Sequence, residues 1–222
     1  NEPHAKPIHP RLDISGDVVR FREGSNQSVP LADIFFRAII GQGIPEGESP
    51  GLEASAHFEP TDASFSFGTA AAIVSADPES GEFTVERFVM AHDSGVPVNP
   101  LLVEGQVRGG LVQGLGAALT EDLQIDPGTG QLTSGSMLDY FAPTAADVPP
   151  IELLHSEIPS PVTTFGVRGV GEVGTIPPGA AVANALCDAL ADYGIELSAL
   201  PLTPESVWRA VKAARVSGEE RL

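Results

Sequence analysis

The sequence predicts an α+β fold, and three observations support this fold class. Strand-like and helix-like segments are mixed along the chain without the regular alternation that indicates a parallel βαβ sheet. Hydrophobic residues make up 42% of the 222 residues, which is typical of a globular chain and enough for one sizeable core or two small lobes. The 24 Gly and 20 Pro residues indicate many turns and short elements.

The N-terminal quarter of the chain is predicted to contain an extended arm, a short hairpin, a helix and a loop. Residues 1–13 are expected to form an extended, proline-containing arm, followed by a domain over residues 14–222. Residues 14–24 alternate around a Gly-Asp pair, which predicts a short hairpin. Residues 30–40 have helical spacing, whereas residues 41–56 are rich in Gly, Pro, Glu and Ser and predict a loop.

The middle of the chain carries the clearest strand patterns. Residues 64–77 and 82–93 are strand-like and flank the turn sequence PESG, so they predict a hairpin. Residues 103–123 predict a helix that tolerates several glycines, and residues 130–143 predict a further strand.

Two helices are predicted near the C-terminus. Residues 177–194 begin with prolines and end at Gly194, which is the usual placement of these two residue types around a helix. Residues 202–216 offer Thr203 as the N-cap and Pro204 as the first helical residue.

The charge and the terminal sequence exclude several classes of function. The net charge of -18 and pI near 4.4 oppose binding to nucleic acid or to anionic membranes. The single cysteine, Cys187, excludes an internal disulfide, and no apolar run is long enough to span a membrane. The first residues do not predict a signal peptide and lack Met, so we expect a chain that is processed, trimmed or cut from a longer one.

The segment GVRGVGEVG, residues 166–174, contains the spacing G-x-G-x-x-G. A dinucleotide site needs a strand directly before these glycines and a helix directly after them. Here prolines interrupt both flanks, and Glu172 places a carboxylate where a pyrophosphate would lie. Two interpretations of Glu172 remain from the residues alone: a general base left unshielded by its glycine neighbours, or a cap of the following helix. The five histidines, His92 among them, show no metal-ligand spacing, so no metal site is assigned.

Four segments together resemble one family. GVRGVGEVGTIPPGAAVANALCDAL resembles the glutamate-bearing active-site segment of molybdenum hydroxylases of the xanthine oxidase, aldehyde oxidase and aerobic carbon monoxide dehydrogenase type. HDSGVPVNPLLVEGQVRGGLVQGLGAALTEDL resembles the segment that leads into a pterin-contacting helix. GSMLDYFAPTAADVPPIE and LPLTPESVWRAV resemble the family's linker strand and C-terminal helix, in the same order, and the latter is similar to the carbon monoxide dehydrogenase-like branch.

The resemblance implies a fold, a cofactor and roles for three residues. The fold would be a mixed sheet with packed helices, forming the C-terminal part of the molybdopterin-binding large subunit over residues 14–222. Glu172 would be the base that takes a proton from a hydroxyl activated by molybdenum, in the oxidative hydroxylation of an aldehyde or N-heterocycle, or in CO oxidation. Gln106 would hydrogen-bond the pterin, and the backbone of Gly171 would approach the molybdenum ligands.

Other roles for the same residues stay open. Gln106 can instead satisfy backbone groups at a helix start. Gly109, Gly110, Gly114 and Gly116 are interpreted mostly as sites of close helix packing. Arg168 would place a positive charge near Glu172 and favour its ionised form.

The resemblance also implies what lies elsewhere. The family's large subunit is much longer, so this chain would hold an incomplete molybdopterin site and be inactive alone. Iron–sulfur and FAD groups are expected only on partner subunits, because one cysteine cannot ligate a cluster. The remainder of the large subunit, or a split partner chain, would complete the site in the bacterial cytoplasm. The alternative is a non-catalytic assembly or scaffold fragment of the same fold.

Overall fold

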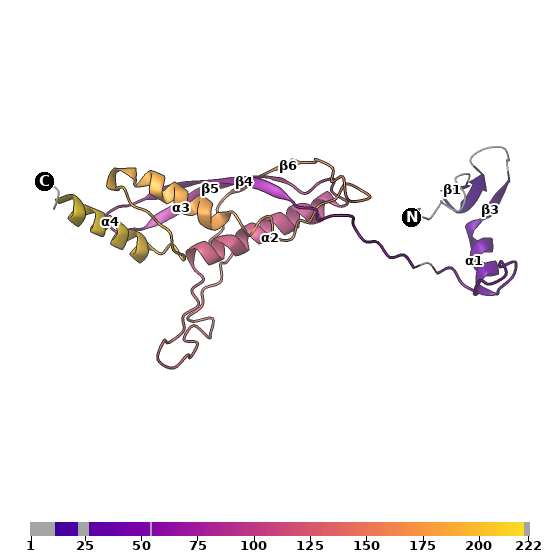
Figure 1. Cartoon of the computed structure of the whole chain (residues 1–222), viewed down its shortest axis with the longest axis horizontal. Helices are drawn as coiled ribbons and strands as arrows, with labels where there is room; N and C mark the ends of the chain where they lie inside the picture. The colour runs from indigo at the N-terminus through magenta and orange to yellow at the C-terminus, as the bar shows by residue number, and fades with distance from the viewer. Residues whose placement is uncertain (1–11, 22–26, 54, 220–222) are drawn as a thin grey trace. The chain divides into compact units, whose positions relative to one another are not determined.

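The structure is a computed structural model that describes residues 12–21, 27–53 and 55–219 (Figure 1). The chain forms two compact units, Asn1–Glu59 and Pro60–Leu222. The sequence did not indicate a division at this point. The arm predicted over residues 1–13 lies outside the described residues except for Leu12 and Asp13, which begin the first strand.

The first unit is a three-stranded antiparallel sheet followed by one helix. Its elements are β1 (Leu12–Ser15), β2 (Val18–Phe21), β3 (Ser28–Pro30) and α1 (Leu31–Ile39). The predicted hairpin is confirmed, because Ser15 pairs with Val18 across a turn in which Gly16 has a φ of 62°. Helix α1 is confirmed too, but it buries no residue: Phe36 is 64% exposed and Ile39 is 68% exposed.

The second unit is a three-stranded sheet with helices packed against it. Its strands are β4 (Phe67–Ala76), β5 (Phe83–Asp93) and β6 (Ile151–Ser156), in the order β4-β5-β6. The β4–β5 pair is antiparallel and the β5–β6 pair is parallel, so the sheet is mixed. Its helices are α2 (Pro100–Leu119), α3 (Pro178–Ala189), the 3-10 turn η1 (Ala191–Tyr193) and α4 (Pro204–Glu219). The α+β fold class is confirmed.

The ends of these helices follow from their sequences. Asn99 caps α2 by accepting the N–H of Leu102, and Pro100 occupies the first helical position. The predicted N-cap of α4 is confirmed, because the hydroxyl of Thr203 accepts the N–H of Ser206 at 3.1 Å. Gly194 ends the η1 turn in the left-handed conformation, with a φ of 62°.

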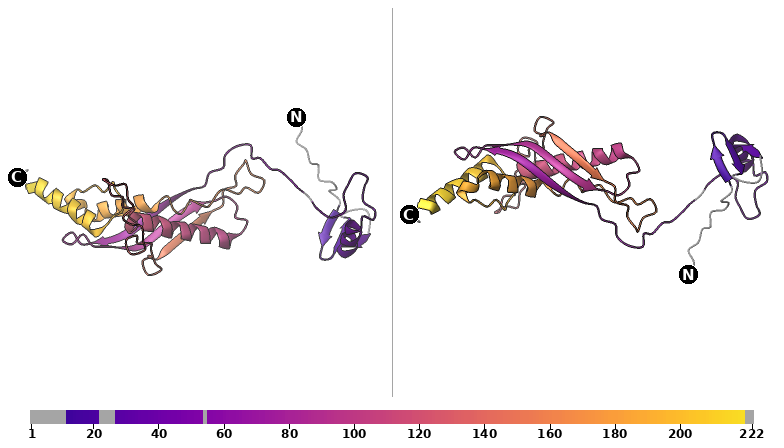
Figure 2. Two further views of the ribbon diagram at one scale, coloured as in Figure 1. Left: turned by 90° about the horizontal axis from the view of Figure 1, so that it is seen from below. Right: turned by 90° about the horizontal axis from the view of Figure 1, so that it is seen from above.

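The core lies between one face of the sheet and the helices (Figure 2). Helix α2 contributes residues at helical spacing, Val107, Leu111 and Leu115. They pack with buried side chains from the sheet and the other helices: Phe88, Met90, Val182, Leu186, Val207 and Val211. The opposite face of the sheet is not covered within the described residues of this chain, where Phe67 is 52%, Ile73 54% and Leu154 52% exposed.

The strand predicted over residues 130–143 is wrong. Only an isolated bridge joins Ile125 to Leu132, and the segment between α2 and β6 extends away from the helices and sheet (Figure 1). Ser136 turns the chain in this segment, because its hydroxyl accepts the N–H of Leu138 at 3.3 Å and its carbonyl accepts the N–H groups of Asp139 and Tyr140. Strand β6 was not predicted from the sequence; its six residues precede a Pro-containing segment. None of the helices within the described ranges has the length and apolar character needed to cross a membrane.

Glycines on α2 allow a backbone-to-backbone approach. A Cβ on Gly114 would lie 2.6 Å from the carbonyl oxygen of Thr175 and 2.7 Å from Cγ of Pro178. A Cβ on Gly116 would lie 2.7 Å from Cδ of Pro143, whereas Gly109 faces open space. The packing interpretation therefore holds for Gly114 and Gly116, but not for Gly109.

These two environments predict opposite effects of the same substitution. Gly114→Ala should lower the free energy of unfolding by about 1–3 kcal/mol, because the contacting backbone has to move. Gly109→Ala should raise it by about 0.5–1 kcal/mol, because alanine favours the helix and meets nothing. Urea unfolding of the purified chain measures both, and equal changes for the two variants would contradict the packing argument.

Candidate functional site

The loop that carries Glu172 is fixed on its N-terminal side by the end of β5. The backbone N–H of Arg168 donates to the carbonyl of Ser94 at 2.9 Å, and the N–H of Val96 donates to Gly166 at 3.1 Å. Gly95 pairs with Val167 as an isolated bridge. The start of the loop is therefore joined to the sheet by backbone hydrogen bonds.

The same loop is fixed on its C-terminal side by α2. A Cβ on Gly174 would collide with the carbonyl oxygen of Val107 and lie 2.9 Å from the N of Leu111. A Cβ on Gly110 would lie 3.1 Å from the Cα of Gly174, which confirms the packing interpretation of Gly110. Only glycine on both sides allows this approach, and it holds the loop against the helix turn that follows Gln106.

Glu172 lies exposed between these two attachment points. Its carbonyl accepts the N–H of Thr175 at 3.0 Å, but its carboxylate has no hydrogen-bond or ion-pair partner among the described residues. Helix α3 has no side-chain N-cap, so the interpretation of Glu172 as a helix cap is wrong. Gly171 is exposed and faces open space, which leaves the carboxylate unshielded by its neighbour.

Gln106 lines a hollow of about 280 Å³ between the start of α2 and the loop. The hollow is walled mainly by apolar side chains, including Val103 of the helix and Val170 of the loop. Within the described part of the chain the amide of Gln106 has no hydrogen-bond partner, so it does not serve to satisfy a helix start. An amide in this state can both donate and accept toward a ligand. The structure therefore brings the turn of Gln106 and the loop of Glu172 together.

Arg168 pairs with Asp93 rather than with Glu172. Its Nε lies 3.5 Å from Oδ1 of Asp93, and the two side chains are 15% and 1% exposed. The expectation that Arg168 supplies a positive charge to Glu172 is therefore wrong: the charge is used inside the protein.

The environment of Asp93 favours its ionised form. Burial alone would raise its pKa, but N–H groups of Ile158 and Gly95, the hydroxyl of Ser156 and the charge of Arg168 together hold the pKa below its usual value. No role was predicted for Asp93 from the sequence. The signal available there is an acid that ends an apolar strand before a Ser-Gly pair, and this signal does not reveal that the acid is the partner of Arg168.

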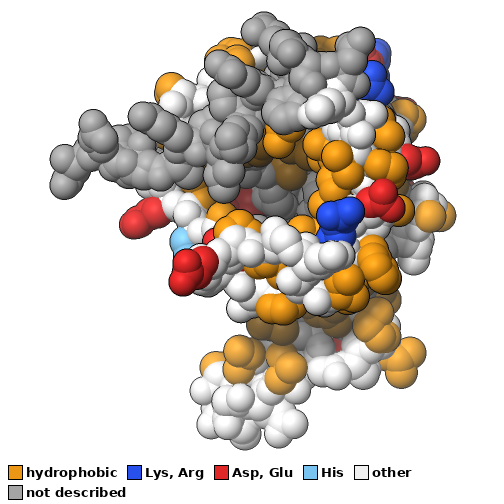
Figure 3. Space-filling view, turned by 90° about the vertical axis from the view of Figure 1, so that its right-hand side faces the viewer, with side chains coloured by type: hydrophobic (Ala, Val, Ile, Leu, Met, Phe, Trp, Pro, Cys, Tyr) orange, Lys and Arg blue, Asp and Glu red, His pale blue; other side chains and the backbone are white. Residues whose placement is uncertain are grey.

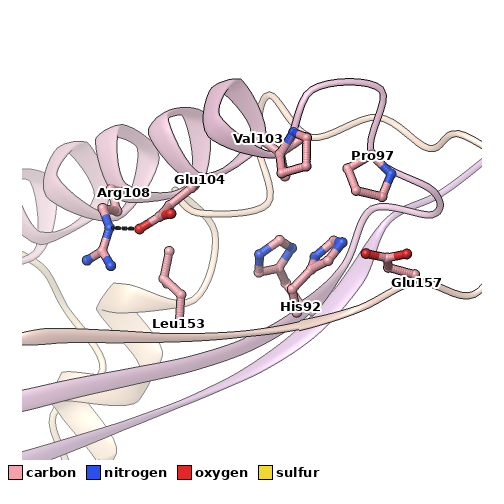
Figure 4. Close-up of a pocket in the computed structure, with 9 residues that line it drawn as sticks. His92, Pro97, Val103, Glu104, Arg108, Leu153 and Glu157 are labelled. Carbon is pink, nitrogen blue, oxygen red and sulfur yellow. Dashed lines mark hydrogen bonds and ion pairs between the residues drawn. The ribbon is translucent and has the colours of Figure 1, made fainter.

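A second hollow, of about 220 Å³, lies on the other side of the segment before α2 (Figure 4). It is lined by His92 and His155, whose rings lie 4.7 Å apart because β5 and β6 pair in parallel at this position. Glu104, Arg108 and Glu157 supply its charged groups, with Glu104 and Arg108 paired to each other. No group of three His, Cys, Asp or Glu side chains in the described ranges could hold a metal ion.

Comparison with known proteins identifies relatives that match most of the chain. The family model described as a molybdopterin cofactor-binding domain matches residues 5–149, which include Gln106 but end before Glu172. The chain is 47% identical over 168 residues to the nicotine 6-hydroxylase large subunit of Paenarthrobacter nicotinovorans, covering 76% of this chain and 20% of that protein. It is 35% identical over 205 residues to the carbon monoxide dehydrogenase large chain of Hydrogenophaga pseudoflava, covering 90% and 25% respectively.

A solved structure agrees with these relatives. Quinoline 2-oxidoreductase from Pseudomonas putida 86 matches with a TM-score of 0.80 and 35% identity, covering 91% of this chain and 26% of that one. The chain thus spans about a fifth to a quarter of the length of the curated relatives named above.

The histidine pair predicts a pH dependence of stability. Burial, followed by the nearby His155, lowers the pKa of His92 from its usual 6.5, although Asp93 opposes this shift. The unfolded chain therefore binds a proton at His92 more readily, so the free energy of unfolding should fall as pH drops from 7.5 to 5. Replacing His92 with Gln should reduce this fall, as denaturant unfolding at each pH would measure. The control is the exposed His57→Gln, and an unchanged pH slope in the His92 variant would contradict the expectation.

Proposed function

The chain belongs to the molybdopterin cofactor-binding family that includes the large subunits of molybdenum hydroxylases, and on this premise we propose that it is the C-terminal portion of such a subunit, with Glu172 as its active-site base. The observation that carries this proposal is that two polar side chains lie exposed and without partners among the described residues. Glu172 and Gln106 are exposed, have no partner among the described residues, and stand on a loop and a helix that are packed together.

The residues present fit a pterin cofactor. The hollow beside Gln106 offers an apolar wall and the amide of Gln106, which has no hydrogen-bond partner among the described residues, and a pterin edge carries both donors and acceptors. Gln106 would hold the pterin edge, and the open backbone at Gly171 would allow close approach of the rest of the group. When bound, the molybdenum cofactor supplies the redox chemistry by accepting two electrons from the substrate.

Glu172 would act by moving a proton. The carboxylate of Glu172 has no hydrogen-bond partner among the described residues, so it is available to accept a proton from a hydroxyl. The carboxylate oxygen and the hydroxyl oxygen would have to lie about 2.6–3.2 Å apart. The attachment of the loop at Gly166–Arg168 and at Gly174 keeps the carboxylate in place. General-base catalysis of this kind contributes typically about 100- to 10,000-fold to a rate.

The rest of the site would come from outside this chain. The relatives are several times longer, and 6-hydroxypseudooxynicotine dehydrogenase is named as a complex of subunits. Exposed apolar side chains also support the presence of partners that cover part of the surface. Leu138, for example, is 85% exposed. Hydrophobic side chains are also prominent on the face shown in Figure 3. We assign the iron–sulfur and FAD groups to such partner subunits.

The substrate class we favour is an N-heteroaromatic ring. Two of the most similar proteins are named for nicotine and quinoline, at 47% and 35% identity. The carbon monoxide dehydrogenase large chain is 35% identical and an aldehyde oxidoreductase is 33% identical, so these chemistries rank below the first. The scaffold alternative is not favoured, because a scaffold needs neither a free amide nor a free carboxylate at this place.

Glu172→Gln in the assembled enzyme should lower kcat by at least about 100-fold, because it keeps the size of the side chain and removes the base. Molybdenum content should stay that of the parent enzyme. Steady-state kinetics with metal analysis makes the measurement, and the exposed Glu196→Gln is the control. A rate equal to that of the parent would support the scaffold instead.

The isolated chain should retain no molybdopterin and show no turnover, because it supplies only one wall of the site. Metal analysis of the purified chain and dye reduction with an N-heterocycle test this. Stoichiometric molybdenum together with turnover would refute the incomplete site.

A further inference from the structure

We propose that Arg168 and Asp93 are positioning residues that fix the loop bearing Glu172, an inference that rests on the proposed function. The pair is nearly desolvated, with side chains 15% and 1% exposed. Burying two charges is costly unless their remaining hydrogen-bonding groups are satisfied. The hydrogen-bonding groups of Arg168 and Asp93 have partners, and these partners come from separate parts of the chain.

Arg168 joins segments that are far apart in the sequence. Its Nε donates to the carbonyl of Ile158 at 3.2 Å, and its Nη1 donates to the carbonyl of Phe65 at 2.8 Å. Asp93 accepts the N–H of Ile158 at 2.7 Å and that of Gly95 at 2.9 Å. The pair therefore ties the end of β5, the segment before β4 and the segment after β6 to the start of the loop.

This arrangement limits where Glu172 can lie. An extended chain spans about 3.3–3.6 Å per residue, so the Cα of Glu172 stays within about 14 Å of that of Arg168. Gly174 fixes the loop again just beyond Glu172. Gly169 and Gly171 would otherwise give the loop wide backbone freedom. Holding both ends restricts the positions open to the carboxylate, which is the condition for efficient proton transfer.

The positive charge of Arg168 and the planar set of donors that carries it contribute separately. The guanidinium meets three acceptors at once, on Asp93, Ile158 and Phe65, which suits its planar set of donors. A lysine would keep the charge and the ion pair with Asp93. Methionine has a similar stem but neither charge nor donors, so it would leave Asp93 buried and unpaired.

The test uses Arg168→Met in the assembled enzyme, with Arg168→Lys as the conservative rescue. The control is Arg215→Met, since Arg215 also forms an ion pair, with Glu79, and donates to Tyr193, but lies on α4 away from the loop. The readouts are molybdenum content, kcat and KM separately, and amide hydrogen exchange at Val96, Gly166 and residue 168, whose N–H groups form the hydrogen bonds that hold the start of the loop. If Arg168→Met does not assemble, the double variant Arg168→Met/Asp93→Asn removes the unpaired charge and carries the same test.

We expect exchange at Val96, Gly166 and residue 168 in Arg168→Met to rise about 10-fold while exchange in α3 stays unchanged. We expect kcat to fall about 10- to 100-fold with KM changed less than about 2-fold, because the base is displaced rather than removed. Arg168→Lys should restore both in part, because it keeps the charge beside Asp93 but not the planar set of donors, and Arg215→Met should change neither.

Two results would overturn the positioning role: unchanged exchange of the loop, or faster exchange with an unchanged kcat while Glu172→Gln abolishes turnover. Failure of the proposed function is distinct, because Glu172→Gln would then keep its rate. Exchange at Val96, Gly166 and residue 168 would still decide whether the pair fixes the loop.

Discussion

The close approach of α2 to the segment that follows Glu172 is the constraint on which the rest of the structure depends. Gly110 and Gly174 bring two backbones together where any side chain would hold them apart. This contact lets Val107 and Leu111 enter the core while Gln106, on the same turn, stays at the surface. A wider spacing would open the core and separate the amide from the carboxylate, so packing and function depend on the same glycines.

The few positive charges of this acidic chain are used in different ways. Arg108, Arg209 and Arg87 form exposed pairs with glutamates, which contribute little to stability in water. Arg168 differs, since its partner Asp93 is fully buried and both are satisfied by backbone groups. A buried ion pair of this kind adds little net stability, but it fixes the positions of the segments that it joins. The role of Arg168 therefore follows from the segments that it connects rather than from its charge alone.

Much of the fold could be predicted from the sequence, and the failures have physical reasons. The hairpin of β4 and β5, and helices α2, α3 and α4, follow from period and capping residues such as Thr203. Strand β6 is too short to be told from a loop, and it is fixed by pairing with β5, which no local pattern reveals. The strand predicted over residues 130–143 fails because its apolar residues have no neighbouring strand, and Ser136 turns the chain instead.

The role predicted for Glu172 came from its glycine neighbours and from the family resemblance. The partner of Arg168 could not be predicted, because it depends on the tertiary contact between distant loops.

The state of the site explains why the chain is expected to work only in a larger assembly. Glu172 and Gln106 present polar groups with no partner among the described residues, and the outer face of the sheet leaves Ile73 and Leu154 exposed. A folded protein seldom leaves both an apolar face and unpaired polar groups in place unless something else covers the one and engages the other. Under the proposed function, the fixed loop would bring the carboxylate of Glu172 already oriented, and the rest of the site would supply the cofactor, the substrate pocket and the exclusion of water. Catalysis would then require assembly with the rest of the site. The contribution of this chain would be the loop position that Asp93, Arg168, Gly110 and Gly174 fix.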